Sequence, residues 1–128
     1  MKLASIDVGL KRIGIAICLT SDIVTPQTAI LRKNRNQAAR DVNIFLKEWE
    51  IEKLIVGFPS ASIDMQNRIN HFVSLLELEI PYEFCEENMS SIEAEDLIKG
   101  EIKYKRDGRV DSLAAKIILE RYLTKKIS

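Results

Sequence analysis

The chain has 128 residues, a length that fits one domain and makes two domains improbable. Apolar residues make up 46% of it and charged residues 30%, a balance that permits a hydrophobic core and argues against wholesale disorder. Nineteen Lys and Arg residues balance nineteen Asp and Glu residues, so no large basic excess points to a polyanionic partner. We therefore expect a single domain over residues 1–128.

Charge is unevenly distributed in the C-terminal third of the chain. Residues 81–100 carry six acids and one lysine, a net charge of −5, whereas residues 101–128 carry eight bases and four acids, a net charge of +4. Solvated helix faces often carry such blocks, so charge alone does not identify a partner. No apolar run approaches the roughly 20 residues that cross a bilayer, which predicts a cytoplasmic protein without a membrane partner.

The cysteines and the single histidine limit the possible catalytic groups. Cys18 and Cys85 have neither CxxC spacing nor neighbouring histidines, which indicates buried, reduced thiols. His71 lies off the apolar stripe of a predicted helix, so we expect it to face solvent. A nucleophile activated by histidine is therefore not expected.

Three strands are predicted at the start of the chain, followed by alternating helices and strands. Residues 2–8, 12–19 and 25–31 are apolar or β-branched runs separated by short turns, which indicates an antiparallel meander. From residue 36 the apolar period becomes helical and includes Trp49, which we expect in the core. The later predicted elements are a strand at 53–57, a helix at 62–78, a strand at 81–85, a short helix at 90–100 and a last helix from 110.

Apart from the short helix at 90–100, the order of elements is β-β-β-α-β-α-β-α. This is the order of a ribonuclease H-like α/β domain, with a mixed five-stranded sheet and helices on both faces. Asp7 ends the first strand, Glu87 follows the fifth, and Asp111 begins the last helix. We expect the three acids to meet at one edge of the sheet. Carboxylates are preferred ligands of Mg²⁺ and Mn²⁺, and two such ions about 3.5–4 Å apart can hydrolyse a phosphodiester.

Each acid also has a structural interpretation when it is considered alone. Asp7 precedes a glycine and could be a turn residue, and Glu87 could be one more solvated acid. Asp111 could cap the last helix or complement its dipole. The three positions together favour a metal site.

Short motifs are spread from Met1 to about Leu123, nearly the whole chain. They are DVGLKRIGIA at 7–16, Ser21-Asp22, Gly57-Phe58-Pro59, Glu86-Glu87-Asn88 with Ser90-Ser91, and DSLAA at 111–115 before Ile118-Leu119 and Tyr122-Leu123. Together they resemble the motifs of the YqgF family, Holliday junction resolvase-like proteins described as pre-16S rRNA nucleases. The opening motif combined with DSLAA is the most specific part of this resemblance.

The resemblance implies metal-binding acids at Asp7, Glu87 and Asp111, the residues that the element order also selects. The family's middle motif usually reads Asp-Glu-Arg followed by two threonines, whereas Asn88 stands here in place of the arginine. The loop after the Gly-Phe-Pro motif is also shorter, at residues 60–64. These departures imply a different rim of the active site and the loss of one basic contact.

Other bases could replace that contact. Lys11 and Arg12 lie in a tight hairpin beside Asp7, where they could reach a phosphate or simply be exposed turn charges. Residues 101–109 are predicted to form a mobile basic loop that either contacts a nucleic-acid backbone or is merely solvated. Its bases are Lys103, Lys105, Arg106 and Arg109.

The sequence and this resemblance together predict a metal-dependent endonuclease for structured RNA that processes the 5′ end of pre-16S rRNA. Its expected partners include ribosomal particles, and it is expected to act as a monomer or weak homodimer. One alternative is a resolvase of four-way DNA junctions, which would need a two-fold dimer. Another is a catalytically weak nucleic-acid-binding module of the same fold. Actin-like ATPases also begin with Asp-x-Gly, but they need two such domains, and this chain has the length of one.

Overall fold

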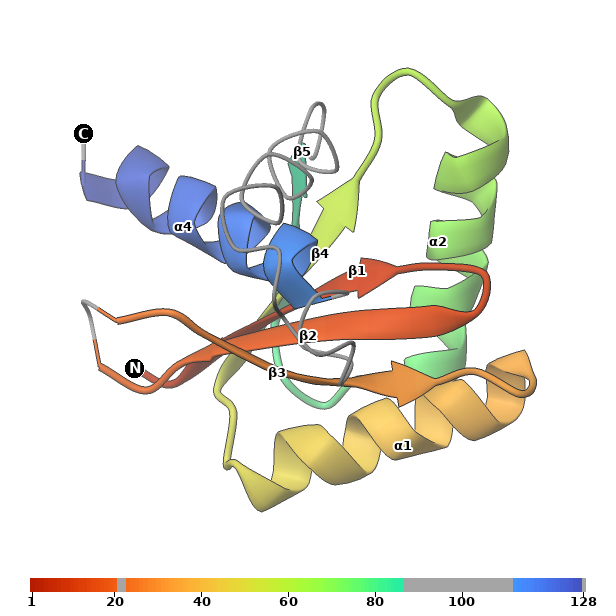
Figure 1. The fold of residues 1–128 in the computed structure, drawn as a ribbon, viewed down its shortest axis with the longest axis horizontal. Helices are drawn as coiled ribbons and strands as arrows, with labels where there is room; N and C mark the ends of the chain where they lie inside the picture. The colour runs from red at the N-terminus through yellow and green to blue at the C-terminus, as the bar shows by residue number, and fades with distance from the viewer. Residues whose placement is uncertain (21–22, 87–111, 128) are drawn as a thin grey trace, which may run out of the picture.

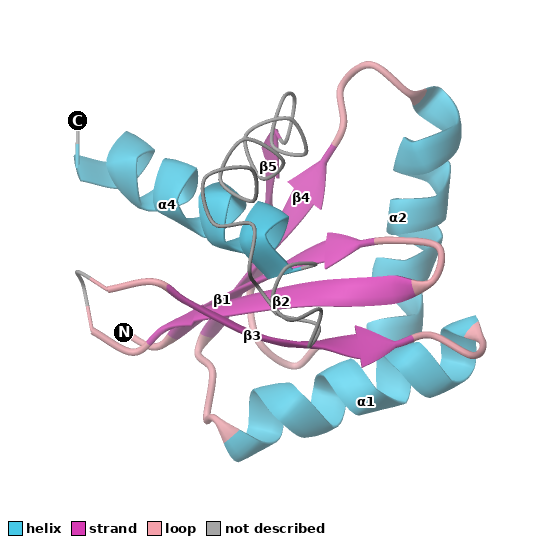
Figure 2. Ribbon diagram, in the orientation of Figure 1, coloured by secondary structure: helices cyan, strands magenta, loops and turns pink. Residues whose placement is uncertain are grey.

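Among the residues that the structure describes, five strands form one sheet, and helices lie on both of its faces (Figures 1 and 2). The structure is a computed structural model that describes residues 1–20, 23–86 and 112–127. The strands are β1 (Leu3–Val8), β2 (Arg12–Cys18), β3 (Thr25–Leu31), β4 (Lys53–Phe58) and β5 (Tyr82–Glu86). The helices are α1 (Arg35–Glu48), α2 (Ile63–Leu76) and α4 (Leu113–Ile127).

The sheet is mixed, with strand order β3-β2-β1-β4-β5. The first three strands form the predicted antiparallel meander, because short turns can join antiparallel neighbours directly. β4 and β5 run parallel to β1, and each is reached through a crossover helix, as parallel pairing requires. The predicted ribonuclease H-like topology is therefore confirmed for these elements.

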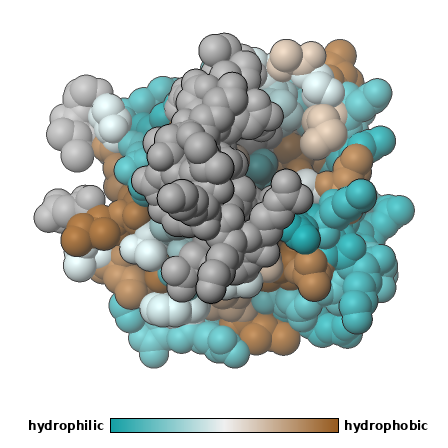
Figure 3. Space-filling view, in the orientation of Figure 1, coloured by the Kyte–Doolittle hydropathy of each residue, from teal (hydrophilic) through white to brown (hydrophobic). Residues whose placement is uncertain are grey.

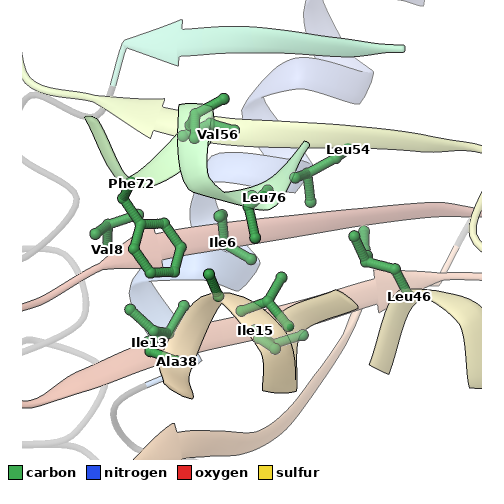
Figure 4. Close-up of a cluster of buried hydrophobic side chains, with 14 of the residues drawn as sticks. Ile6, Val8, Ile13, Ile15, Ala38, Leu46, Leu54, Val56, Phe72 and Leu76 are labelled. Carbon is green, nitrogen blue, oxygen red and sulfur yellow. The ribbon is translucent and has the colours of Figure 1, made fainter. Parts of the chain in front are cut away.

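The larger core lies between the sheet and helices α1 and α2 (Figure 4). Alternate residues of β1, β2 and β4 face it, including Ile6 and Ile15, and both are fully buried. Phe72 and Leu76 of α2 pack on the same residues. Full burial of an aliphatic or aromatic side chain of this size contributes about 1.5–3 kcal/mol, so this face fixes the position of both helices.

Helix α4 covers the opposite face of the sheet. Its buried side chains Ala115, Ile118 and Leu119 pack on the other set of alternating strand residues, such as Ile55 and Cys85. Ala115 and Leu119 are both fully buried. The helix lies close enough to the sheet for its small residues to be enclosed.

A polar cluster holds the far half of α4 to the sheet. Lys53 Nζ lies 2.6 Å from a Glu83 carboxylate oxygen and donates a hydrogen bond of 2.8 Å to the Tyr122 hydroxyl. The hydrogen bond to Glu83, followed by that to Tyr122, raises the pKa of Lys53. The ammonium therefore stays charged in the folded protein, and this contribution to stability is lost only as the pH rises through the raised pKa.

Polar residues cap the first two helices, whereas the prediction that Trp49 lies in the core was wrong. Asn34 caps α1 in a reciprocal capping box with Gln37, and Ser62 caps α2 by accepting from the Met65 amide. Trp49 was expected in the core, yet it is 37% exposed and packs on Phe45 with ring centroids 6.0 Å apart. It follows the last residue of α1, beyond the last turn that rests on the sheet.

The predicted burial of the two cysteines and exposure of the histidine are confirmed. Both cysteines are free and buried, and His71 is exposed on α2. Among the described residues, no helix combines the length and the apolar character that crossing a membrane demands. The predicted short helix at 90–100 and the basic loop at 101–109 lie outside the described residues.

We expect the thiol of Cys85 to be unreactive in the folded protein. Burial raises its pKa, and the thiolate is the reactive form. In a Cys18→Ser variant, which isolates Cys85, labelling by a disulfide reagent at pH 8 should be at least tenfold slower than in guanidinium chloride. Equal labelling rates in the two conditions would contradict this expectation.

Candidate active site

Asp7 is the next-to-last residue of β1 and is partly buried. Its neighbours Ile6 and Val8 face the core on the side of α1 and α2, so alternation places Asp7 on the α4 side. Ser5 lies on that same side and donates a hydrogen bond of 2.6 Å to the Ala115 carbonyl of α4. Asp7 is thus a strand residue, not the turn residue that its neighbourhood to glycine also allowed.

Glycines flank Asp7 in the sheet. Gly14 of β2 pairs directly with Asp7. On the other side, Val56 of β4 pairs with Ile6, so Gly57 is the next residue beside Asp7. Because neither neighbour has a side chain, the sheet leaves room on both sides of this carboxylate.

The start of α4 is fixed near Asp7 by a buried hydrogen bond. The Ser112 hydroxyl accepts from the Ile15 amide at 3.0 Å, and Ser112 is fully buried. Ile15 pairs with Ile6, the residue before Asp7. The bond therefore places Ser112 next to the strand pair Ile6–Ile15, one residue along the sheet from Asp7. Asp111 lies outside the described residues but is adjacent to Ser112 in the sequence.

The end of β5 lies at the same end of the sheet. Cys85 pairs with Gly57, in the row of Asp7, and Glu86 pairs with Phe58 in the row beyond. Two strand spacings, roughly 9–10 Å, separate β1 from β5. Glu87 lies outside the described residues and follows Glu86, whose carboxylate accepts a hydrogen bond of 3.0 Å from Ser60.

Within the described part of the chain, no three His, Cys, Asp or Glu side chains are grouped so that they could hold a metal ion. Of the three predicted ligands, only Asp7 belongs to that part. The predicted metal site therefore rests on Asp7 and on the described residues next to Glu87 and Asp111. Ser5 and Ser112 had not been predicted as site residues, and their polar side chains in otherwise apolar elements were the available signal.

The hairpin after Asp7 is closed by main-chain contacts. The Gly9 amide donates to the Arg12 carbonyl at 3.0 Å, and a β-carbon at Gly9 would lie 2.6 Å from that carbonyl oxygen, so glycine is required there. Lys11 and Arg12 are both exposed. Both predicted contact residues therefore reach solvent at the end of the sheet where Asp7 lies. The other predicted contacts, Lys103, Lys105, Arg106 and Arg109, lie outside the described residues.

A family model described as "Holliday junction resolvase", RuvX, matches residues 1–125. The chain belongs to the RuvX family. RuvX is another name for the YqgF family, so this match confirms the family that the sequence motifs indicated. It covers the hairpin, the Gly-Phe-Pro motif and the DSLAA segment.

Curated relatives match over almost their full length. A protein of Sulfurovum sp. (strain NBC37-1) is 64% identical over 127 residues, covering 97% of this chain and 99% of that protein. A protein of Sulfurimonas denitrificans is 51% identical over 129 residues, with 98% and 99% coverage. Both carry the name "Putative pre-16S rRNA nuclease".

Solved structures confirm the fold at low sequence identity. RuvC of T. thermophilus, in complex with a Holliday junction substrate, superposes with a TM-score of 0.64 at 13% identity, covering 99% of this chain and 96% of that one. The Holliday junction resolvase of fowlpox virus gives a TM-score of 0.58 at 18% identity and covers both chains fully. The RuvX chain thus has the fold of these resolvases.

Two serines order the shortened loop of this RuvX protein. Ser60 joins it to the end of β5 through Glu86, and Ser62 ends it as the cap of α2. The loop therefore bridges β5 and α2 beside the candidate site. Asn88, Ser90 and Ser91, the other departures from the family pattern, lie outside the described residues.

The Ser112 hydrogen bond should matter more for stability than that of Ser5. Ser112→Ala leaves the buried Ile15 amide without its acceptor, and we expect the free energy of unfolding to fall by about 1–3 kcal/mol. In Ser5→Ala the partner is a helix carbonyl that can keep its main-chain bond, so the loss should be about 1 kcal/mol or less. Urea unfolding measures both, and equal losses would contradict this ranking.

Proposed function

We propose that this RuvX-family protein is a metal-dependent endonuclease that hydrolyses phosphodiester bonds in structured RNA and processes the 5′ end of pre-16S rRNA. The observation that carries this proposal is the position of Asp7, beside two glycines and at the same end of the sheet as the end of β5 and the start of α4. The names of the curated relatives support the choice of RNA. Such a role would place the protein in the cytoplasm, in contact with ribosomal particles.

The proposed ligands of Mg²⁺ or Mn²⁺ are Asp7, Glu87 and Asp111. Carboxylates are a donor set that suits these hard cations. The Asp7 carboxylate has room on both sides, and the two other acids adjoin residues fixed at this end of the sheet, Glu86 and Ser112. The chemistry that such ions supply when bound is activation of a water molecule and stabilisation of the leaving oxygen.

The chain's own residues would hold and orient the substrate. Lys11 and Arg12 are exposed on the hairpin that follows Asp7, where they can contact phosphates on either side of the scissile bond. The single histidine, His71, lies on α2 and contacts Arg35 of α1, on the other side of the sheet. No imidazole is therefore available as a general base, which fits a reaction that relies on carboxylates.

Cleavage of four-way DNA junctions is the second candidate activity. The description of the family and the solved neighbours support it, because both are Holliday junction resolvases. Symmetric cleavage of such a junction would require a two-fold dimer. For the RNA reaction, a monomer or weak homodimer suffices.

Asp7→Asn should abolish cleavage of a pre-16S rRNA fragment in Mg²⁺ or Mn²⁺, with a loss of at least a hundredfold. The substitution removes a proposed ligand charge while keeping the size of the side chain, so circular dichroism and thermal unfolding should show a folded protein. Glu48→Gln, the same chemical change on an exposed residue of α1, is the matched control and should cut normally. Undiminished cleavage by purified Asp7→Asn would end the nuclease assignment for this site.

Parallel assays should separate the candidate activities. We expect the wild-type protein to cleave the pre-16S rRNA fragment at least tenfold faster than a four-way DNA junction, with EDTA stopping both reactions. Faster, symmetric cleavage of the junction by a dimer would favour the resolvase. Binding of both substrates with no cleavage in either metal would instead indicate a binding module.

A further inference from the structure

Three arginines gather where the β1–β2 hairpin, the start of α1 and the middle of α2 meet. They are Arg32 just after β3, Arg35 in the first turn of α1, and Arg68 of α2, and we call them the arginine cluster. Arg35 and Arg68 are exposed, and Arg32 is partly buried. Hydrophilic side chains gather at this end of the molecule, along the right of the view (Figure 3).

Arg32 is held in a defined place at the centre of the cluster. Its Nη1 donates a hydrogen bond of 2.8 Å to the Gly9 carbonyl, and its guanidinium lies 5.6 Å from the ring centroid of Phe72. Its main-chain amide also donates to the Lys11 carbonyl at 2.9 Å. Burial first, and then the charges of Arg35 and Arg68, lower the pKa of Arg32. The charges of Arg35 and Arg68 therefore both act on Arg32.

Within the described part of the chain, no acid forms a salt bridge with the arginine cluster. The salt bridges there, Lys2–Glu50 and Lys53–Glu83, lie elsewhere, and Asp64, one turn before Arg68, forms none with it. Arg35 Nη1 instead lies 3.0 Å from His71 Nε2, which must accept because a guanidinium only donates. That contact adds no negative charge.

The helix dipole increases the same positive potential. The first turn of α1 contains Arg35 and no acid, although this position favours acids. Such an arrangement lowers the stability of the free protein, both through the dipole and through repulsion among the arginines. A bound polyanion would reverse both effects.

We propose that the arginine cluster binds the phosphate backbone of structured RNA, as an extension of the proposed site; the choice of RNA rests on the proposed function. Asp7 faces the α4 side of the sheet, whereas the cluster lies toward α1 and α2, and the exposed hairpin with Lys11 and Arg12 connects the two. Arg32 bonds to Gly9, two residues after Asp7. A duplex that leaves the proposed site would therefore pass over the hairpin and reach the cluster.

The test measures RNA binding without cleavage. A fluorescein-labelled RNA hairpin is titrated in EDTA, and the dissociation constant is followed by anisotropy between 50 and 200 mM salt. Arg35→Gln combined with Arg68→Gln should weaken binding roughly tenfold or more at 100 mM salt. The slope of log affinity against log salt should fall by about 1.4–1.8, because each lost phosphate contact contributes about 0.7–0.9. Arg32 stays unchanged because it supports the hairpin.

Two further variants separate the cluster from general charge loss. Arg40→Gln combined with Lys47→Gln removes two exposed charges from α1 that are not among those acting on Arg32, and it should leave binding within twofold of wild type. Arg35→Lys combined with Arg68→Lys keeps the charge and should restore most of the affinity. Thermal unfolding verifies that every variant is folded.

The outcomes distinguish this inference from the proposed function. If Arg35→Gln with Arg68→Gln binds RNA like wild type, or if the control variant weakens binding equally, the arginine cluster is not a phosphate-binding surface, even where Asp7-dependent cleavage is observed. If the cluster variant weakens binding selectively and the wild-type protein cuts neither substrate, the surface stands and the nuclease proposal fails.

Discussion

The parallel pairing of β1 with β4 and of β4 with β5 decides where the candidate site can form. Parallel strands present their carboxyl ends at one end of a sheet, so residues far apart in sequence meet there. In this protein Asp7, Gly57 and Cys85 lie in one row across the three strands. The pairing persists because helices bury both faces of β1 and β4, and β5 adds the buried Cys85 on the α4 side.

Hydrogen bonds of two serines fix the position of α4 relative to these strands. Ser5 and Ser112 are fully buried polar residues, and each hydrogen bond that they form joins the helix to β1 or β2. An apolar contact could slide along the sheet at little cost, whereas a buried amide must keep its partner. The start of α4 is therefore held near Asp7 by the same bonds that contribute to stability, and stability and site geometry are linked at this point.

Charges of opposite sign are arranged around the same end of the molecule. Asp7, the one proposed metal ligand among the described residues, lies toward α4, and the arginine cluster lies toward α1 and α2, with the exposed hairpin between them. Repulsion within the cluster and an arginine in the first turn of α1 oppose folding, and the Phe72 face and the Gly9 carbonyl partly offset this for Arg32. A surface of this kind is suited to a long polyanion that spans several elements.

The sequence by itself determined the order of the elements, the antiparallel meander, the buried thiols and the family, because strand and helix periods and short motifs are local properties. It also selected Asp7, Glu87 and Asp111 from strand and helix ends, although only Asp7 belongs to the described residues. Trp49 was misplaced because its helical period continues past the last turn that meets the sheet. The glycines beside Asp7, the Ser112 bond and the gathering of three arginines were decided only by the tertiary structure, since strand register and the packing of remote elements bring together residues that no local pattern relates.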